Sequence, residues 1–188
     1  VLPTFIEAAG GKPANSLDGK SMISLLRGKT NHHKDYVYGE VTTRGIINGT
    51  DLYPIRTVRD DRFRLVWNLN PEAKYTNALT RTPAFQSMVE KAKSGESHAQ
   101  EFVRRYQHRP ELELFDCQMD PLEMNNLAEY PEFRGTIRKL KGKLQQWMNS
   151  QGDNGIQTEL DSIYRHRNAI GKTKEEVDAA WAKKNNRK

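Results

Sequence analysis

Four basic side chains that could hold an anion lie close together in the second half of the chain: Arg104, Arg105, His108 and Arg109. A guanidinium group presents a fork of N–H donors that matches the oxygens of a sulfate or a carboxylate. Such a cluster could therefore bind a sulfated sugar chain. Basic residues near a helix C-terminus also interact favourably with the helix dipole, so a purely structural role is the alternative.

The histidines and the cysteine give weaker signals for chemistry. His32 and His33 are adjacent in a polar segment, and no cysteine or third histidine lies at the spacing of a zinc site. Cys117 is the only cysteine, so no disulfide can form within the chain. The sequence also has no G-x-S-x-G nucleophile motif and no phosphate-cradling glycine loop. These residues therefore predict neither a catalytic nucleophile nor a metal site.

Composition limits the classes of partner. Hydrophobic residues make up 36% of the 188 residues, and the mean hydropathy is −0.86, which indicates a small hydrophobic core and a predominantly polar surface. The net charge of +6 permits an anionic partner. Basic and aromatic residues do not interleave as they do on nucleic-acid-binding sheets, so we predict no nucleic-acid partner. No apolar run approaches the roughly 20 residues of a membrane helix, so we predict no membrane span.

The sequence pattern predicts short strands that would position these side chains. Strands are expected at residues 36–43, 54–59, 63–68 and 112–116, which are rich in β-branched, aromatic and leucine residues. In the third of them, Phe63, Leu65 and Trp67 alternate with other residues and form one bulky apolar face. Asp60-Asp61 separates the two middle segments, which we expect to form a hairpin.

Helical patterns cover most of the remaining chain. The clearest is 131–150, where Phe133, Ile137, Leu140, Leu144 and Met148 recur every three or four residues and form one apolar stripe. We expect this stripe to lie across the sheet. Further helices are expected at 82–93, 96–107 and after Asp120-Pro121, which resembles a helix start. The predicted fold class is α+β, an antiparallel sheet of about four strands packed by a long C-terminal helix.

Three groups of motifs carry a resemblance to a known family. They are Tyr53-Pro54-Ile55-Arg56 followed by Phe63-Arg64-Leu65-Val66 and Asn68-Leu69, the segment 3–10 followed by 17–21, and Asp116-x3-Asp120-Pro121-x-Glu123-x-x-Asn126-Leu127-Ala128. In their order along the chain, these motifs resemble the C-terminal region of the sulfatase family over about residues 1–153. The helices expected at 82–93 and 96–107 follow residues 68–72. They resemble the helical insertion that members of the heparan N-sulfatase (sulfamidase) branch carry at the same place.

The resemblance implies three parts in the chain. Residues 1–30 would be the trailing segment of an N-terminal α/β catalytic domain, 31–153 the C-terminal sulfatase subdomain, and 154–188 a helical basic tail. The sequence opens at Val1 within a helical motif and without an initiator methionine, so we expect a piece of a longer protein. Its partner would then be the N-terminal catalytic domain, and the resemblance implies a secreted, periplasmic or lysosomal parent.

The resemblance also implies where substrate would bind. In the family, the strand at 36–43 and the loop after it run toward the substrate pocket, which makes Glu40, Thr42, Thr43 and Arg44 the substrate-binding candidates. Arg44 suits a sulfate oxygen, and an ordinary surface loop is the alternative. The sulfamidase branch carries a His-rich stretch where this chain has 42–45, so the exact substrate stays open. Asn48-Gly49-Thr50 is a formal glycosylation sequon.

The family's chemistry implies cofactors for the parent enzyme. Sulfatases use a formylglycine made from a cysteine in Cys-x-Pro/Ala-Ser/Thr-Arg, together with calcium held by aspartate and asparagine oxygens. Cys117 does not stand in that motif, and Asp60-Asp61 is not the family's calcium pair, so we assign no catalytic residue and no metal ligand to this chain.

The resemblance implies that the parent hydrolyses sulfate esters or sulfamates of sugars or glycosaminoglycans. This chain would shape the substrate pocket and be inactive alone. A stand-alone module that binds sulfated glycans through Arg44 and the 104–109 cluster is the alternative.

Overall fold

The computed structural model describes residues 1–42 and 52–185, and its contacts divide the chain into Val1–Val37 and Tyr38–Lys188. The first unit holds two short helices, α1 (Leu2–Ala8) and α2 (Ile23–Leu26). Proline suits the first turn of α1 because that turn's N–H groups have no partner within the helix. The hydroxyl of buried Thr4 accepts a hydrogen bond from the Met22 N–H at 3.0 Å, which links the two helices.

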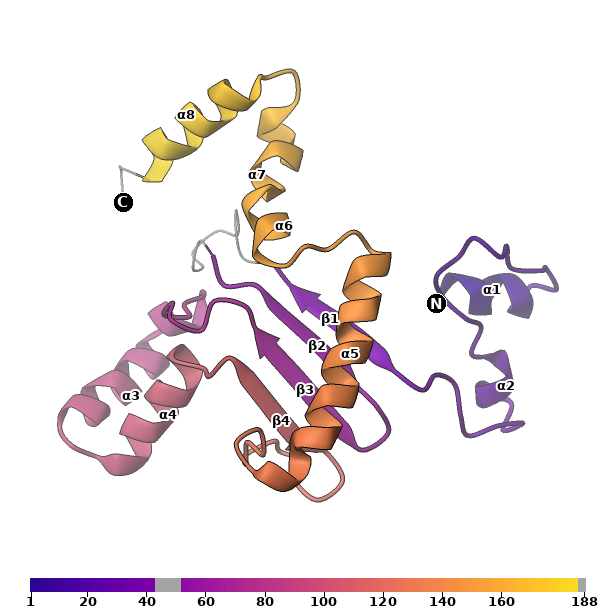
Figure 1. Cartoon of the computed structure of the whole chain (residues 1–188), viewed down its shortest axis with the longest axis horizontal. Helices are drawn as coiled ribbons and strands as arrows, with labels where there is room; N and C mark the ends of the chain where they lie inside the picture. Colours follow the sequence, from indigo (N-terminus) through magenta and orange to yellow (C-terminus); the bar gives the residue numbers. More distant parts are fainter. Residues whose placement is uncertain (43–51, 186–188) are drawn as a thin grey trace. The chain divides into compact units, whose positions relative to one another are not determined.

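The second unit is built on a four-stranded sheet in the order β1-β2-β3-β4 (Figure 1). The strands are β1 (Val37–Val41), β2 (Ile55–Arg59), β3 (Phe63–Asn68) and β4 (Leu112–Asp116). The pairs β2/β3 and β3/β4 are antiparallel, and Leu65 lies opposite both Val58 and Leu114. The predicted α+β class and its four strands are confirmed.

Asp60 closes the hairpin between β2 and β3. Its carboxylate oxygen Oδ1 accepts hydrogen bonds from the backbone N–H of Arg62 at 3.1 Å and of Phe63 at 2.7 Å. An aspartate that bonds to backbone groups two and three residues ahead stabilises a turn without the glycine that a two-residue hairpin requires. The hairpin expected around Asp60-Asp61 is therefore present.

The helix α5 (Arg134–Ser150) lies across one face of the sheet and is preceded by the short helix η2 (Pro131–Phe133) (Figure 1). Leu140, Leu144 and Met148 of its stripe are buried, as predicted. Phe63 packs edge-on against Phe133 of η2, with ring centroids 5.9 Å apart. These contacts place the Phe63, Leu65 and Trp67 face of β3 under η2 and α5.

Trp67 is covered partly by a charged side chain. The ammonium group of Lys141 on α5 lies 4.3 Å from the centre of the Trp67 ring. The same ammonium lies 3.5 Å from a carboxylate oxygen of Glu111. A long lysine side chain can cover an aromatic surface in this way while its charge stays in contact with water.

The opposite face of the sheet carries a second cluster and a helical hairpin. Its buried members are Tyr53, Ile55, Val66 and Phe115, with Tyr75 packed against them. The hairpin consists of α3 (Pro83–Lys93) and α4 (Ser97–Gln107), and η1 (Leu79–Arg81) precedes it. The ring of Tyr106 on α4 lies 5.8 Å from that of Tyr75, which connects the hairpin to the cluster.

Residues 117–129 form turns, and the helix expected after Asp120-Pro121 is wrong. The Asp120 carboxylate accepts from the Asn125 N–H at 2.7 Å, five residues ahead. Glu123 has a backbone φ of 54°, in the left-handed region that a right-handed helix excludes. The carboxylate of Glu123 forms an ion pair with Arg64 on β3. This contact to the sheet outweighs the local helix-start signal.

The chain ends in short helices: α6 (Ile156–Leu160), α7 (Ser162–Arg165), η3 (Arg167–Ala169) and α8 (Lys174–Asn185). Ile163, Ala169 and Val177 form their own small buried cluster, with Trp181 against it. Within the described residues, no helix has the length and apolar character needed to cross a membrane.

Candidate functional site

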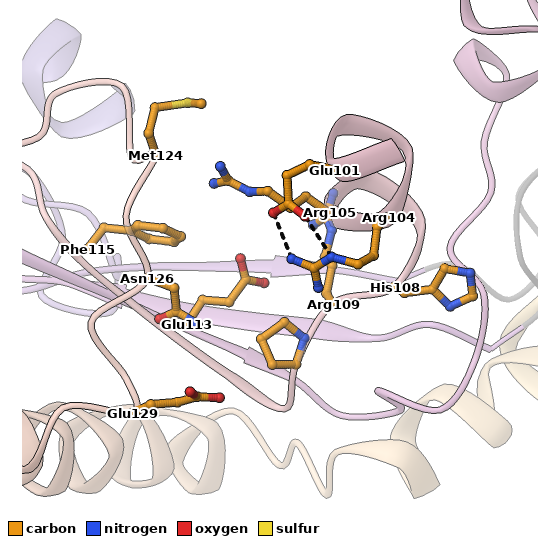
Figure 2. A pocket seen from close by; sticks show the side chains of 11 residues that line it. Glu101, Arg104, Arg105, His108, Arg109, Glu113, Phe115, Met124, Asn126 and Glu129 are labelled. Atoms are coloured by element: carbon orange, nitrogen blue, oxygen red, sulfur yellow. Dashed lines mark hydrogen bonds and ion pairs between the residues drawn. The ribbon is translucent and has the colours of Figure 1, made fainter. Parts of the chain in front are cut away.

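A cavity of about 500 Å³ opens on the face of the sheet away from α5. Figure 2 shows Glu101, Arg104 and Arg105 reaching from α4 on one side, and Phe115, Met124 and Asn126 on the other. The cavity therefore lies between α4, β4 and the 117–129 turn. Its lining residues include all four members of the 104–109 basic cluster that the sequence singled out.

The arginines of this cluster differ in their partners. Arg104 makes two hydrogen bonds to the carboxylate of Glu101, at 2.8 and 2.7 Å. Within the described residues, Arg105 donates a single long bond of 3.5 Å, to the Glu123 carbonyl, and the guanidinium of Arg109 stacks 4.7 Å from the centre of the Tyr75 ring. Among residues 1–42 and 52–183, no carboxylate forms an ion pair with Arg105 or Arg109.

Acceptor and apolar groups complete the lining. Glu113 projects from β4 into the cavity and accepts a hydrogen bond from the buried Asn68 amide at 2.7 Å. Asn126 holds the turn in place, because its oxygen accepts from the Leu114 N–H at 2.9 Å. An adjoining hollow of about 440 Å³ shares several lining residues and adds Phe102, Tyr106 and others.

Two of the four substrate-binding candidates lie in the described part of the chain. Glu40 is on β1, and its carboxylate lies 4.0 Å from Nε of Arg56. Thr42 follows β1 directly and is exposed. Thr43 and Arg44 lie outside the described residues, as does the sequon Asn48-Gly49-Thr50. Neither Glu40 nor Thr42 lines the 500 Å³ cavity, so the structure does not bring these two together with the 104–109 cluster.

Arg56 is the residue whose importance the sequence did not reveal. Its side chain is fully buried and donates from Nε and Nη2 to the two carboxylate oxygens of Asp153, at 2.5 and 3.2 Å. Its Nη1 donates to the carbonyl of Val41, the last residue of β1, at 3.2 Å. The available signal was an arginine on the same strand face as Val58, where an apolar residue is expected.

The pKa of Asp153 reflects this contact. Burial by itself raises the pKa of the carboxyl, but the hydrogen bonds from Arg56 and from the Gly155 N–H outweigh it and hold the pKa below its ordinary value. The carboxylate is therefore charged at neutral pH. The pair holds the end of β1, the start of β2 and the segment after α5 in one arrangement.

The residues present do not fit the cofactors that the resemblance implies for the parent. In the described part of the chain, no group of three or more histidine, cysteine, aspartate or glutamate side chains could hold a metal ion. Burial raises the pKa of the Cys117 thiol, which contacts the Glu123 carboxylate at 3.5 Å. A raised pKa is the opposite of what an activated cysteine needs.

Comparisons with known proteins give sequence relatives over most of the chain. The chain is 35% identical over 153 residues to an ulvan-active sulfatase of Formosa agariphila. The matched region covers 81% of this chain and 28% of that protein. A second ulvan-active sulfatase of the same organism is 29% identical, over 86% of this chain and 26% of its own length. Human N-sulphoglucosamine sulphohydrolase is 28% identical, over 76% of this chain and 26% of its own length. No protein-family model matches.

The chain thus spans about a quarter of the length of these relatives. Solved structures share its fold. A 2-O GAG sulfatase superposes with a TM-score of 0.53 at 20% identity, over 82% of this chain and 25% of that one. A protein solved with its substrate D-glucosamine-2-N,6-O-disulfate superposes with a TM-score of 0.52 at 17% identity, over 82% of this chain and 24% of that one.

Proposed function

Because the chain belongs to the sulfatase family, we propose that it is the C-terminal part of an enzyme that hydrolyses sulfate esters or sulfamates of sugars. The observation that carries this proposal is the 35% identity to an ulvan-active sulfatase over 81% of the chain. The names of the relatives supply the substrate class: ulvan for two of them, and a sulfated glucosamine for a third. A glycosaminoglycan or a related sulfated glycan is therefore the proposed substrate.

The proposed role of this chain is to close one wall of the substrate pocket. Glu40, Thr42, Thr43 and Arg44 would face the substrate at the end of β1. Two observations support this role: Glu40 approaches Arg56 at 4.0 Å, and Arg56 binds the Val41 carbonyl at 3.2 Å. A buried guanidinium that is hydrogen-bonded to the last residue of β1 would keep the residues after β1 in a defined position.

The reactive groups would come from the N-terminal catalytic domain, which is the proposed partner of this chain. That domain would contribute the formylglycine and the calcium ligands. In this proposal residues 1–30 belong with the catalytic domain, 31–153 form the C-terminal subdomain, and 154–188 are an appended tail.

The experiment is an activity assay of the 188-residue chain alone. With calcium present, we expect no hydrolysis of 4-methylumbelliferyl sulfate above a heat-treated control. Joined to the preceding sequence of its own reading frame, the protein should hydrolyse a sulfated sugar. Turnover by the chain alone would overturn the proposal. So would the lack of a Cys-x-Pro/Ala-Ser/Thr-Arg motif upstream.

A second proposed function is a module that binds sulfated glycans. The observation in its favour is that Arg105 and Arg109 line one cavity and form no ion pair with a carboxylate among the described residues. We expect the chain to be retained on heparin and to elute earlier when Arg104 and Arg105 are replaced by glutamine. Unchanged elution would argue against this function.

A further inference from the structure

We propose that the cavity between α4, β4 and the 117–129 turn binds one sugar unit that carries a single anionic group, a sulfate or a carboxylate. Arg105 and Arg109 would hold the anion, and Glu113 would accept hydrogen bonds from sugar hydroxyls. The inference deepens the second proposed function, because it names the ligand class and the site.

The arginines near this cavity differ in whether a carboxylate already pairs with them. Of the three arginines that line this cavity, Arg104 pairs with Glu101. Arg64, which lines the adjoining hollow, pairs with Glu123. Arg105 and Arg109 form no ion pair with a carboxylate among the described residues. Arg105 lies on the last turn of α4 and Arg109 lies just after the helix, and both line the same cavity.

Within the described residues, contacts other than an ion pair with a carboxylate hold both guanidinium groups in place. Arg109 stacks on two tyrosine rings, 4.7 Å from the centre of Tyr75 and 5.9 Å from that of Tyr106. Arg105 is half-buried and bonds to the Glu123 carbonyl. Stacking and a backbone contact limit side-chain freedom but leave N–H donors available. Such preorganisation lowers the entropic cost of binding an anion.

The acidic residues decide which kind of anion fits. Glu101, Glu113 and Glu129 line the cavity beside Arg104, Arg105 and Arg109, so carboxylates and arginines are equal in number. A second anionic group placed beside these carboxylates inside the cavity would be repelled by them. A sugar unit with one sulfate or carboxylate instead offers hydroxyl donors to the carboxylates and one acceptor group to the arginines.

The volume of the cavity and its apolar lining are also suitable for a single sugar unit. The volume of about 500 Å³ lies in the ordinary range of small-molecule pockets. Phe115 and Met124 line the same cavity and offer an apolar surface to the C–H face of a sugar ring. Charged donors, acceptors and an apolar wall thus meet in one place.

The test is an NMR titration of the 15N-labelled 188-residue chain. The probes are glucose 6-sulfate, glucuronic acid, glucose and inorganic sulfate. We expect saturable shifts around α4 and β4 with glucose 6-sulfate, glucuronic acid or both, and the stronger of the two identifies the anion. Glucose and inorganic sulfate should bind at least about tenfold more weakly, because each lacks half of the recognised groups.

Two variants and a matched control sharpen the result. Arg105→Gln and Arg109→Gln should each weaken binding about tenfold or more, and Arg138→Gln, which removes the same charge from the exposed side of α5, should not. If Arg109→Gln unfolds the chain, Arg105→Gln still decides, because Arg105 makes one long hydrogen bond within the part of the chain that the structure describes.

The inference is overturned if neither anionic sugar binds up to about 20 mM, if glucose binds equally well, or if both variants retain full affinity. Its failure is distinct from that of the function beneath it. Retention on heparin without sugar binding would contradict the cavity site and support a basic surface that binds polyanions. Sugar binding without retention on heparin would support the cavity site and contradict the glycan-binding module.

Discussion

Arg56 and Asp153 lie 97 residues apart and form a buried ion pair, with Nε of the arginine 2.5 Å from Oδ2 of the aspartate. The arginine side chain is fully buried, and that of the aspartate is 5% exposed. A third bond from the same guanidinium reaches the Val41 carbonyl. One side chain therefore joins β1, β2 and the segment that follows α5.

Replacing Arg56 by methionine should destabilise the fold. The change leaves the Asp153 carboxylate buried without its partner, and breaking a buried pair in this way costs about 3–5 kcal/mol. Urea unfolding measures the difference in the free energy of unfolding. The double variant with Asp153→Leu should recover part of the loss, because it removes the unpaired charge.

The control for this prediction is Arg104→Met. Its ion pair with Glu101 joins side chains that are 61% and 52% exposed, and such a pair contributes about 1 kcal/mol or less. Equal losses in Arg56→Met and Arg104→Met would contradict the structural role of the buried pair.

The stability of the chain should depend on pH through Asp153. Its pKa in the folded chain lies below the value of about 3.9 for an unfolded aspartate. At acidic pH the unfolded state therefore binds more protons, so stability rises with pH. The contribution is fully present above the unfolded pKa and is lost as the pH falls through the folded pKa.

The measurement is urea unfolding of the wild type and of Asp153→Asn between pH 3 and pH 7. The stability difference between the two should be constant near neutrality and shrink below about pH 4. A difference that stays the same over the whole range would show that Asp153 does not titrate as its contacts require.

Leu144→Ala tests the packing of α5 on the sheet. Leu144 is fully buried in the stripe, and truncating such a leucine to alanine costs about 2–5 kcal/mol. The adjacent Gln145 is exposed, so Gln145→Ala should change stability by less than about 0.5 kcal/mol. Thermal or urea unfolding of the pair gives the comparison. A Leu144 variant as stable as the Gln145 variant would mean that α5 does not cover the sheet.

Arg44→Ala tests the proposed substrate wall in the complete enzyme that contains this segment. If Arg44 binds a sulfate or carboxylate of the substrate, its loss should raise KM about tenfold or more, because a hydrogen bond to a charged group contributes about 1.5–3 kcal/mol. Arg138→Ala removes an exposed positive charge from α5 and should leave KM unchanged. A KM for Arg44→Ala equal to that of the control would remove Arg44 from the substrate site.

The local elements of this fold could be predicted because neighbouring residues carry their signals. The alternation of Phe63, Leu65 and Trp67 indicated a strand with one apolar face. The three- and four-residue spacing of the stripe in α5 indicated a helix that needs a surface to cover. Burying an apolar stripe on an apolar sheet face is the strongest available gain in free energy, so the two segments meet as predicted.

The 104–109 cluster was visible in the sequence, but its site was not. Glu113, Phe115 and Met124 come from β4 and the following turn, and only the packing of α4 beside them forms a cavity. The helix expected at Asp120 failed for a related reason. The local signal was correct for a helix start, but the ion pair of Glu123 with Arg64 on β3 favours a turn.

By itself, therefore, the sequence determined the strands, the long helix, the apolar face between them and the family motifs, because each depends on residues close together in the chain. Only the tertiary structure decided that Arg56 is buried against Asp153, and that Arg105 and Arg109 face one cavity without an ion pair to any carboxylate in the described part of the chain. Those relationships depend on which distant groups come within hydrogen-bonding distance, and no local periodicity encodes that.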